Sequence, residues 1–284
     1  MNKQIQAVMD QDTETFSYVV WEANKQAIVI DPVLDFHAES GRTSTTTADR
    51  LIEIVRSQNL QVKYILETHA HADHLSAAPY LKEQVGGLIG IGEHITEVQA
   101  HFRTVFGLEK QMLPNGSEFD LLLKDGDVLS VGDMQIHVMH TPGHTYADVA
   151  YRIDDAVFVG DTLFMPDVGT ARCDFPGGDA AQLYDSIQAL LSLPDDTSVF
   201  VCHDYPKDRK HRYQTSVLKQ REENIHVGGS TTKEQFVRMR EERDKTLGLP
   251  RYIIPSIQVN MRAGRMPEPD EAGRRYLKVP LNML

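Results

Sequence analysis

The sequence has few of the residues that mark secreted or membrane-spanning proteins. Its 284 residues include only two cysteines, Cys173 and Cys202, which are too few for a disulfide framework and favour a reducing compartment. No apolar run approaches the roughly 18 residues that a membrane-spanning helix requires. The segment before Asp10 lacks the apolar stretch of a secretory signal. We therefore expect a cytoplasmic protein that does not bind membranes.

Positive charge is also scarce. The chain has 29 Lys and Arg against 41 Asp and Glu, which gives a formal net charge of −12 at pH 7. Because a negative surface repels phosphate backbones, we expect no nucleic-acid partner. With 41% hydrophobic residues, a chain of this length buries a large core. We expect one domain over residues 1–284, with its core at about 10–205 and a C-terminal helical and extended appendage at about 206–284.

Strand-like and helix-like patterns alternate along the chain, as is typical of an α/β protein. The runs 16–21 and 26–30 predict a hairpin, whereas 33–45 lacks periodicity and is expected to be a loop. Thr46 or Thr47 is expected to cap a helix whose apolar face is Leu51, Ile54 and Val55. Further strands are predicted at 62–66, 88–91, 128–131, 134–140, 148–153, 156–159 and 199–202, and further helices at 76–84, 95–106, 180–191, 216–224 and 231–247.

Potential metal ligands are concentrated directly after the predicted strand 62–66. His69, His71, Asp73 and His74 fall within six consecutive residues. Imidazole nitrogens and a carboxylate suit zinc, iron or manganese. The simpler alternative is a polar loop whose histidines cap the helix that follows. Three more ligand-type residues, each just past an apolar strand, argue against it: His144, Asp161 and His203.

This pattern resembles the metallo-β-lactamase superfamily over residues from about 16 to 204. The segments 142–145, 159–162 and 202–205 resemble the family's PGHT, GDT and HDY elements. All seven ligand positions of the family are occupied. The resemblance implies an α/β fold, the αββα sandwich of the metallo-β-lactamase type.

Two further segments resemble the persulfide dioxygenases within this superfamily. Residues 169–179 are similar to their GxGRxDFxxG segment, part of which glyoxalase II shares. Residues 255–264 are similar to their PxNMRxG tail, which favours the dioxygenases. The chain departs from the pattern at Thr170, at Ala171 and in a longer loop over 35–47.

The resemblance implies that glutathione persulfide, or another low-molecular-weight persulfide, reacts with O2 and water to give sulfite and the free thiol. One Fe(II) per chain would be held by His69, His144 and Asp161, which leaves three coordination sites open. The remaining ligand-type residues would orient ligands or bound water, with Asp73 counted among the catalytic residues. These residues are His71, Asp73, His74 and His203.

The same seven residues also fit a rival assignment. A glyoxalase II-like hydrolase of thioesters such as S-lactoylglutathione would hold two zinc ions, or a mixture of iron, zinc and manganese, that activate water. His69, His71 and His144 would bind one ion and Asp161 would bridge. Asp73, His74 and His203 would bind the other. A third alternative is a binding protein that kept the pocket without catalysis.

Candidate substrate contacts are Arg172, Tyr205 and Arg212. Glutathione carries two carboxylates, so a protein of net charge −12 needs local cations to bind it. Arg172 has the alternative role of tying down its own loop by a salt bridge. Arg172 would lower the pKa of the adjacent Cys173, yet we expect neither cysteine to be a catalytic nucleophile. The sequence leaves the oligomeric state open, and a homodimer is one alternative.

Overall fold

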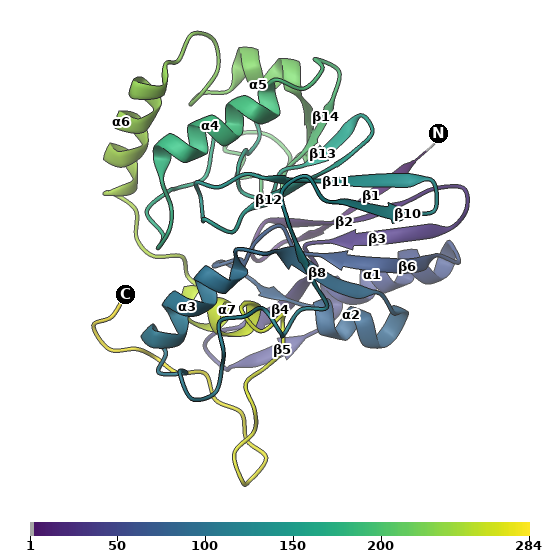
Figure 1. Cartoon of the computed structure of the whole chain (residues 1–284), viewed down its shortest axis with the longest axis vertical. Coiled ribbons are helices and arrows are strands. Elements are labelled where there is room, and N and C mark those ends of the chain that lie inside the picture. The colour runs from purple at the N-terminus through teal and green to yellow at the C-terminus, as the bar shows by residue number, and fades with distance from the viewer. Residues whose placement is uncertain (1–2) are drawn as a thin grey trace. The chain divides into compact units, whose positions relative to one another are not determined.

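The computed structural model describes residues 3–284 and divides them into two compact units (Figure 1). The first unit comprises the chain up to Thr13 together with Ser17–Leu122 and Leu249–Leu284. The second comprises Glu14–Phe16 and Leu123–Gly248. Over residues 3–284, no helix has the length and apolar character needed to cross a bilayer. The prediction of a single domain with an appendage after about residue 205 stays a prediction.

The first unit is built on a six-stranded sheet. Strands β2 and β3 form the predicted antiparallel hairpin, and β3, β6 and β8 are parallel neighbours. Ala27–Ile30 of β3 are buried, as expected for a parallel strand that is covered on both faces. The strand order is β1 (Gln4–Asp10), β2 (Thr15–Trp21), β3 (Gln26–Ile30), β6 (Gln61–Leu66), β8 (Leu88–Gly92) and β9 (Leu121–Leu123).

Four helices and a small sheet complete this unit. The helices are α1 (Thr46–Ser57), α2 (Ala78–Val85), α3 (Ile95–Val105) and α7 (Ile253–Asn260), and the small sheet has the order β5 (Arg42–Ser44), β4 (Val33–His37) and β7 (Leu75–Ser76). The prediction of a loop over 33–45 is therefore wrong. The hairpin is stabilised by pairing with β7, about forty residues later, and such a long-range contact leaves no local periodicity. Helix α7 was not predicted from the sequence either.

The second unit carries the other six-stranded sheet, with helices α4 (Ala180–Leu191), α5 (Val217–Glu223) and α6 (Lys233–Asp244). Its core includes Leu183 and Ile187 of α4 and Phe236 of α6. Because β13 and β14 are parallel, both strands end at the same edge of the sheet. The strand order is β10 (Val128–Val131), β11 (Met134–His140), β12 (Val149–Ile153), β13 (Ala156–Phe158), β14 (Ser198–Phe200) and β15 (Gln214–Ser216).

Most predicted elements are confirmed, with shifts of one to three residues at their ends. The predicted cap of the first helix is wrong: the N-cap of α1 is Thr45, and the helix begins at Thr46. Helix α1 buries the predicted apolar face. Helix α2 begins two residues late, because Leu75–Ser76 forms β7. The α/β alternation therefore places both groups of predicted ligands just past strand ends.

Close packing at Gly143 generates the first prediction. Gly143 has a φ of +142°, and a Cβ added there would lie 2.3 Å from the backbone of Leu183 in the first turn of α4. Gly126 has a φ of +79° with nothing within 4 Å of such a Cβ, so it is a matched control for backbone strain alone. We expect Gly126→Ala to lower the free energy of unfolding by about 1 kcal/mol and Gly143→Ala by about 2 kcal/mol more.

Urea denaturation of both variants measures this difference. Equal losses in the two variants would show that α4 shifts away from residue 143 without penalty.

Candidate metal centre

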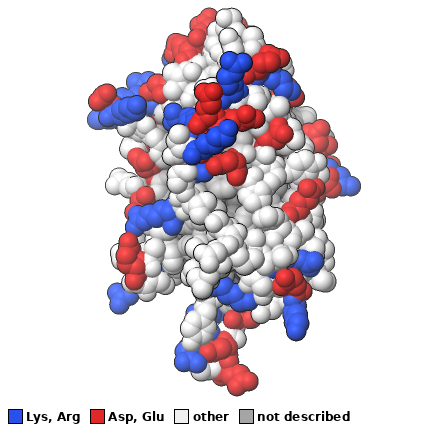
Figure 2. All heavy atoms as spheres, turned by 90° about the vertical axis from the view of Figure 1, so that its left-hand side faces the viewer, with Lys and Arg blue, Asp and Glu red and all other residues white. Residues whose placement is uncertain are grey.

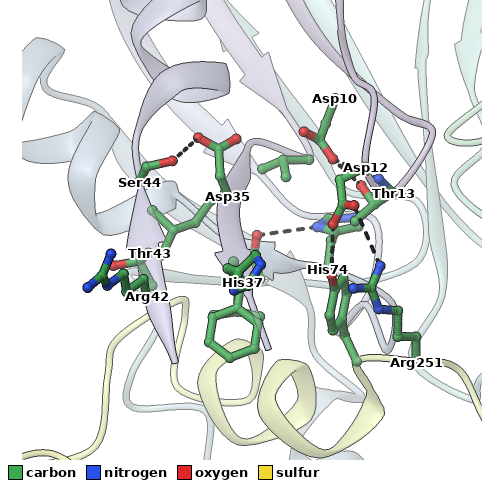
Figure 3. A pocket seen from close by; sticks show the side chains of 15 residues that line it. Asp10, Asp12, Thr13, Asp35, His37, Arg42, Thr43, Ser44, His74 and Arg251 are labelled. Carbon is green, nitrogen blue, oxygen red and sulfur yellow. Dashed lines mark hydrogen bonds and ion pairs between the residues drawn. The ribbon is translucent and has the colours of Figure 1, made fainter. Parts of the chain in front are cut away.

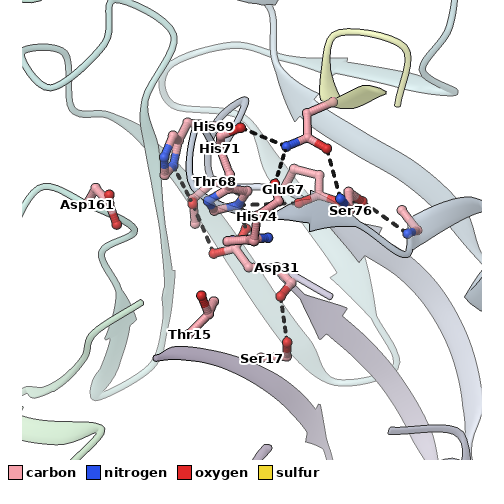
Figure 4. Close-up of polar contacts among 12 residues, drawn as sticks. Thr15, Ser17, Asp31, Glu67, Thr68, His69, His71, His74, Ser76 and Asp161 are labelled. Atoms are coloured by element: carbon pink, nitrogen blue, oxygen red, sulfur yellow. Dashed lines mark hydrogen bonds and ion pairs between the residues drawn. The ribbon is translucent and has the colours of Figure 1, made fainter. Parts of the chain in front are cut away.

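Three buried histidines lie together in the first unit, in the loop that follows β6 (Figure 4). The ring centroids are 4.0 Å apart for His69 and His71, and 4.1 Å apart for His71 and His74. The Thr68 hydroxyl lies 3.1 Å from His69 Nδ1, so Nε2 is the nitrogen of that ring that would ligate a metal. Asp73 is half-buried in the turn between His71 and His74. This unit thus brings together the predicted ligands of its own part of the chain.

Two buried carboxylates orient the central histidine. His71 Nε2 lies 3.1 Å from Asp31 Oδ1 and 3.5 Å from Glu67 Oε2. Asp31 also accepts from the backbone amide of Thr68 at 2.7 Å and from its hydroxyl at 2.9 Å. The Ser76 hydroxyl donates to the other oxygen of Glu67. These contacts fix His71 in one orientation, as carboxylates commonly do for metal-bound histidines.

Burial and charge act on these groups in opposite directions. Burial by itself would lower the pKa of His71, but the charges and hydrogen bonds of Asp31 and Glu67 raise that pKa well above its ordinary value. Burial likewise favours a raised pKa for Asp31, yet His71 and Thr68 hold it below the usual range. For Glu67, burial prevails and its pKa is raised.

The second nitrogen of His71 provides a test of whether this site fits a metal. Its Nδ1 is buried and has no hydrogen-bond partner among residues 3–284. A buried polar atom without a partner costs about 1 to 3 kcal/mol. A metal ion bound at Nδ1 would remove that penalty, and imidazole is a common ligand of zinc, iron and manganese sites. The donor set of the first unit therefore fits a transition metal.

In the second unit, His144 and His203 both lie close to the carboxylate of Asp161. Asp161 Oδ2 lies 3.6 Å from His144 Nε2, and Oδ1 lies 3.5 Å from His203 Nε2. These distances exceed ordinary hydrogen bonds. Two donors that each lie about 2.1 Å from one ion are separated by roughly 3 to 3.5 Å, so the spacing suits shared ligation.

Both histidines of this unit are held through their Nδ1 atoms. His144 Nδ1 lies 2.8 Å from the Arg172 carbonyl, and His203 Nδ1 lies 3.3 Å from the Thr15 hydroxyl. The turn that carries His144 is closed by Asp148, which accepts from Thr145 and whose pKa burial raises to about 6. The predicted triad takes His69 from the first unit and His144 and Asp161 from the second, and it stays a prediction.

The loop that provides the Arg172 carbonyl is anchored by helix α6. Arg240 is 1% exposed and donates to the Thr170 carbonyl at 3.1 Å and to Asp244 at 3.0 Å. Asp244 in turn accepts from the Cys173 amide at 2.8 Å. The predicted polar helix over 231–247 therefore contains a buried ion pair, which a run of charged residues does not reveal.

The predicted substrate residues lie in the second unit. The Arg172 guanidinium donates to both carboxylate oxygens of Asp174 at 2.6 Å and to the Gly248 carbonyl, so it ties down its own loop. Tyr205 is 41% exposed and lies parallel to the His203 ring at 5.7 Å. Arg212 lines a cavity of about 620 Å³. Their roles in substrate binding stay predictions.

One expectation about the cysteines is wrong. Burial raises the pKa of Cys173, in place of the lowering expected from the adjacent arginine.

Lys and Arg are frequent in residues 207–212. Arg209 of this segment forms ion pairs with Asp204 and Asp167. On the face shown in Figure 2, basic and acidic side chains lie interspersed.

A pocket of about 350 Å³ lies beside the histidine loop in the first unit (Figure 3). His74 lines it, and residues of the β4–β5 hairpin, including Asp35 and Arg42, form one of its walls. Arg251 and Tyr252 close it from the C-terminal segment, with the Tyr252 hydroxyl donating to Asp12 at 2.7 Å. The segment predicted as a loop thus shapes the surroundings of a candidate ligand.

Sequence reasoning missed the residues that hold the ligands. Asp31, Glu67 and Asn260 are buried polar residues in contact with the histidine loop. Two features of the sequence pointed to these residues: the strand break at Asp31–Pro32, and the segment 255–264 that resembles a family motif. Neither feature specifies which residues are in contact.

Comparison with known proteins gives consistent matches. A sequence model of the Metallo-beta-lactamase superfamily matches residues 11–203. The chain is 49% identical over 292 residues to a probable metallo-hydrolase of Burkholderia pseudomallei, covering 99% of both chains. It is 47% identical over 269 residues to Glyoxylase B2 of Dictyostelium discoideum, covering 94% of this chain and 92% of that one.

Two more distant matches carry the name ETHE1. The human mitochondrial persulfide dioxygenase ETHE1 is 27% identical over 254 residues, covering 88% of this chain and 84% of that one. The crystal structure of ETHE1 from Myxococcus xanthus superposes with a TM-score of 0.74 at 29% identity, covering 92% of this chain and all of that one.

The second prediction concerns His226, which secures the loop at Gly169 and Thr170. His226 Nδ1 accepts from the Thr170 amide at 2.9 Å, and burial, with Arg240 and Arg243 nearby, lowers its pKa from 6.5 to about 4 despite Asp244. Between these pH values only the unfolded chain holds the proton. Stability should therefore fall as pH drops from about 6.5 to about 4, with about 2 kcal/mol lost between pH 7 and pH 5.

The variant His226→Asn places an amide oxygen near the position of Nδ1 and has no titrating group. Urea denaturation at pH 7 and pH 5 should show a smaller loss in this variant than in the parent. The same loss in both proteins would assign the pH dependence to other groups.

Proposed function

The chain belongs to the metallo-β-lactamase superfamily, and on that premise we propose that it is an iron-dependent persulfide dioxygenase. Its α/β fold is that of the superfamily, and the chain is a metal-binding enzyme of this class. The proposed reaction converts glutathione persulfide, or another low-molecular-weight persulfide, with O2 and water into sulfite and the free thiol. The similarity to proteins named ETHE1 supports it.

One contact carries the proposal. The loop 169–179, which resembles the dioxygenase segment, fixes His144 through the Arg172 carbonyl, and His144 Nε2 faces Asp161. A segment that resembles the dioxygenases thus orients one of the three proposed iron ligands, His144, toward another, Asp161. His69 would complete the ligand set.

The chain's own residues have defined tasks in this proposal. Bound iron would supply open coordination sites for O2 and the persulfide sulfur, together with redox chemistry that zinc does not offer. The Arg172 carbonyl and the Thr15 hydroxyl keep His144 and His203 in fixed orientations. Asp31 does the same for His71. Fixed ligands hold two small reactants in reacting geometry.

We propose that Arg212 binds a substrate carboxylate, and that Tyr205 and Arg172 of the same unit also contact the substrate. Arg212 and Lys219 line one cavity together with Asp167 and Glu223, and Asp167 forms its ion pair with Arg209. Two such cations suit the carboxylates of glutathione. We also propose a cytoplasmic location and no nucleic-acid or membrane partner, and we keep a homodimer as an alternative assembly.

The second candidate function is hydrolysis of thioesters such as S-lactoylglutathione at two metal ions. The relatives at 49% and 47% identity carry the names metallo-hydrolase and glyoxylase. Asp73, His74 and His203 are all present as ligands for the second ion, and His71 is present as a further ligand of the first. Zinc, or mixed iron, zinc and manganese, would then activate water.

The third prediction separates these assignments by metal content. With one iron per chain, Asp161→Ala and His144→Ala should remove most of the metal. Asp73→Ala should keep about one iron and lose about 10- to 100-fold in activity, because Asp73 would act on bound water and not on the ion. His137→Ala, at an exposed strand position, is the control.

Elemental analysis of anaerobically purified protein gives the measurement. Two metal ions in the parent and one in Asp73→Ala would contradict the one-iron proposal.

The fourth prediction compares the two reactions directly. The iron-loaded protein should consume O2 in step with glutathione persulfide, release sulfite, and hydrolyse S-lactoylglutathione poorly. An oxygen electrode and a thioester absorbance assay on one preparation measure both rates. Rapid thioester hydrolysis without oxygen uptake, in protein that holds two zinc ions, would leave the hydrolase as the function.

A further inference from the structure

The C-terminal tail of the first unit contacts the histidine loop through a buried asparagine. Asn260, the last residue of α7, is 4% exposed. Its Nδ2 donates to the carbonyl of His71 and to that of His74, both at 2.7 Å, and its Oδ1 accepts from the Ser76 amide at 2.8 Å. One side chain thus satisfies three buried backbone groups in a six-residue stretch.

These three bonds determine the shape of the turn that presents His71 and His74, which orient ligands in the one-iron assignment and are ligands in the two-metal assignment. The two carbonyls belong to His71 and His74, so one amide nitrogen fixes the distance between their backbones. Without the Asn260 side chain, the turn would expose these carbonyl groups to water or leave them without hydrogen-bond partners.

The residues after Asn260 pack on the same loop. Gly264 has a φ of +80°, and a Cβ added there would lie 2.6 Å from Pro79 Cδ and 2.8 Å from the Ser76 carbonyl. Ser76 donates to Glu67, which in turn lies 3.5 Å from His71 Nε2. The tail therefore reaches the central histidine by two routes, through the backbone of the turn and through the Ser76–Glu67 contact.

We infer that Asn260 is a positioning residue of the metal site, and that docking of the tail and binding of metal stabilise each other. The coupling follows because both require the same conformation of the turn His71–His74, and linkage makes such effects reciprocal. This positioning role gives a physical reason for the motif-like sequence of residues 255–264, which contain no reactive group. The inference rests on the proposed metal site and not on which reaction that site performs.

The substitution Asn260→Asp tests these hydrogen bonds with almost no change in the shape of the side chain. It replaces the donating amide by an oxygen that faces two carbonyl oxygens, while the other oxygen still accepts from Ser76. We expect zinc or cobalt(II) to bind about 100-fold more weakly, and Asn260→Ala, which adds no repulsion, about 10-fold more weakly. Competition with a chromophoric chelator on metal-free protein measures both dissociation constants, and Asn260→Ala carries the test if the Asp variant does not fold.

Gln258 of the same helix provides a matched control. It is 2% exposed, and its amide donates to the carbonyls of Ile254 and Lys278 and accepts from the Lys278 amide, away from the histidine loop. Gln258→Glu therefore disturbs two similar donor bonds in the tail and keeps the acceptor bond, as Asn260→Asp does, and its metal affinity should stay that of the parent. Zinc should also slow hydrogen exchange in residues 260–264 of the parent.

A purely structural role gives a different result. Asn260 variants that are less stable without metal but bind zinc as tightly as the parent would overturn the inference, as would an equal loss of affinity in Gln258→Glu. A parent protein that binds neither zinc nor cobalt(II) would overturn the proposed metal site together with it. Normal metal binding without persulfide oxidation would count against the proposed reaction alone.

Discussion

Buried polar groups beside the histidine loop impose the constraint on which the first unit depends. The rings of His69, His71 and His74 and the carboxylates of Asp31 and Glu67 are all within a few per cent of full burial. Away from water, each of them needs a partner or loses free energy. The partners come from several parts of the chain: the residue after β3, the end of β7 and the end of α7. The fold around the loop brings these partners into contact with the buried groups.

The second unit meets the same requirement with a different construction. Its ligand-type residues lie past the ends of β11, β13 and β14, and a loop brings the carbonyl of Arg172 to His144. The buried ion pair Arg240–Asp244 on α6 forms hydrogen bonds with Thr170 and Cys173 of that loop. A buried ion pair stabilises little by itself, but removing one partner leaves an uncompensated charge, so it fixes the loop in one conformation. In both units a segment from the C-terminal part of the chain holds a ligand-type histidine in place.

The ligand-type residues and most of the strands and helices could be predicted from the sequence, because both leave local signals. His69, His71, Asp73 and His74 stand together in the sequence, and β11 alternates buried and exposed side chains at the period of a strand. The hairpin β4–β5 gave no such signal, because its pairing with β7 spans about forty residues. Helix α7 escaped because it buries the polar Ser256, Gln258 and Asn260 beside its apolar residues, so hydrophobic side chains do not mark a helical period.

The sequence by itself determined which donors are available and that their chemistry suits a transition metal, since residue type and spacing are local facts. Only the tertiary structure decided which nitrogen of each histidine faces a ligand position, because the other nitrogen is occupied by a group such as the Thr68 hydroxyl or the Arg172 carbonyl. It also decided that Asn260 belongs to the histidine loop, 186 residues from His74. Contacts of that range arise when the chain buries its polar groups together, and no pattern in the residues between them records the pairing.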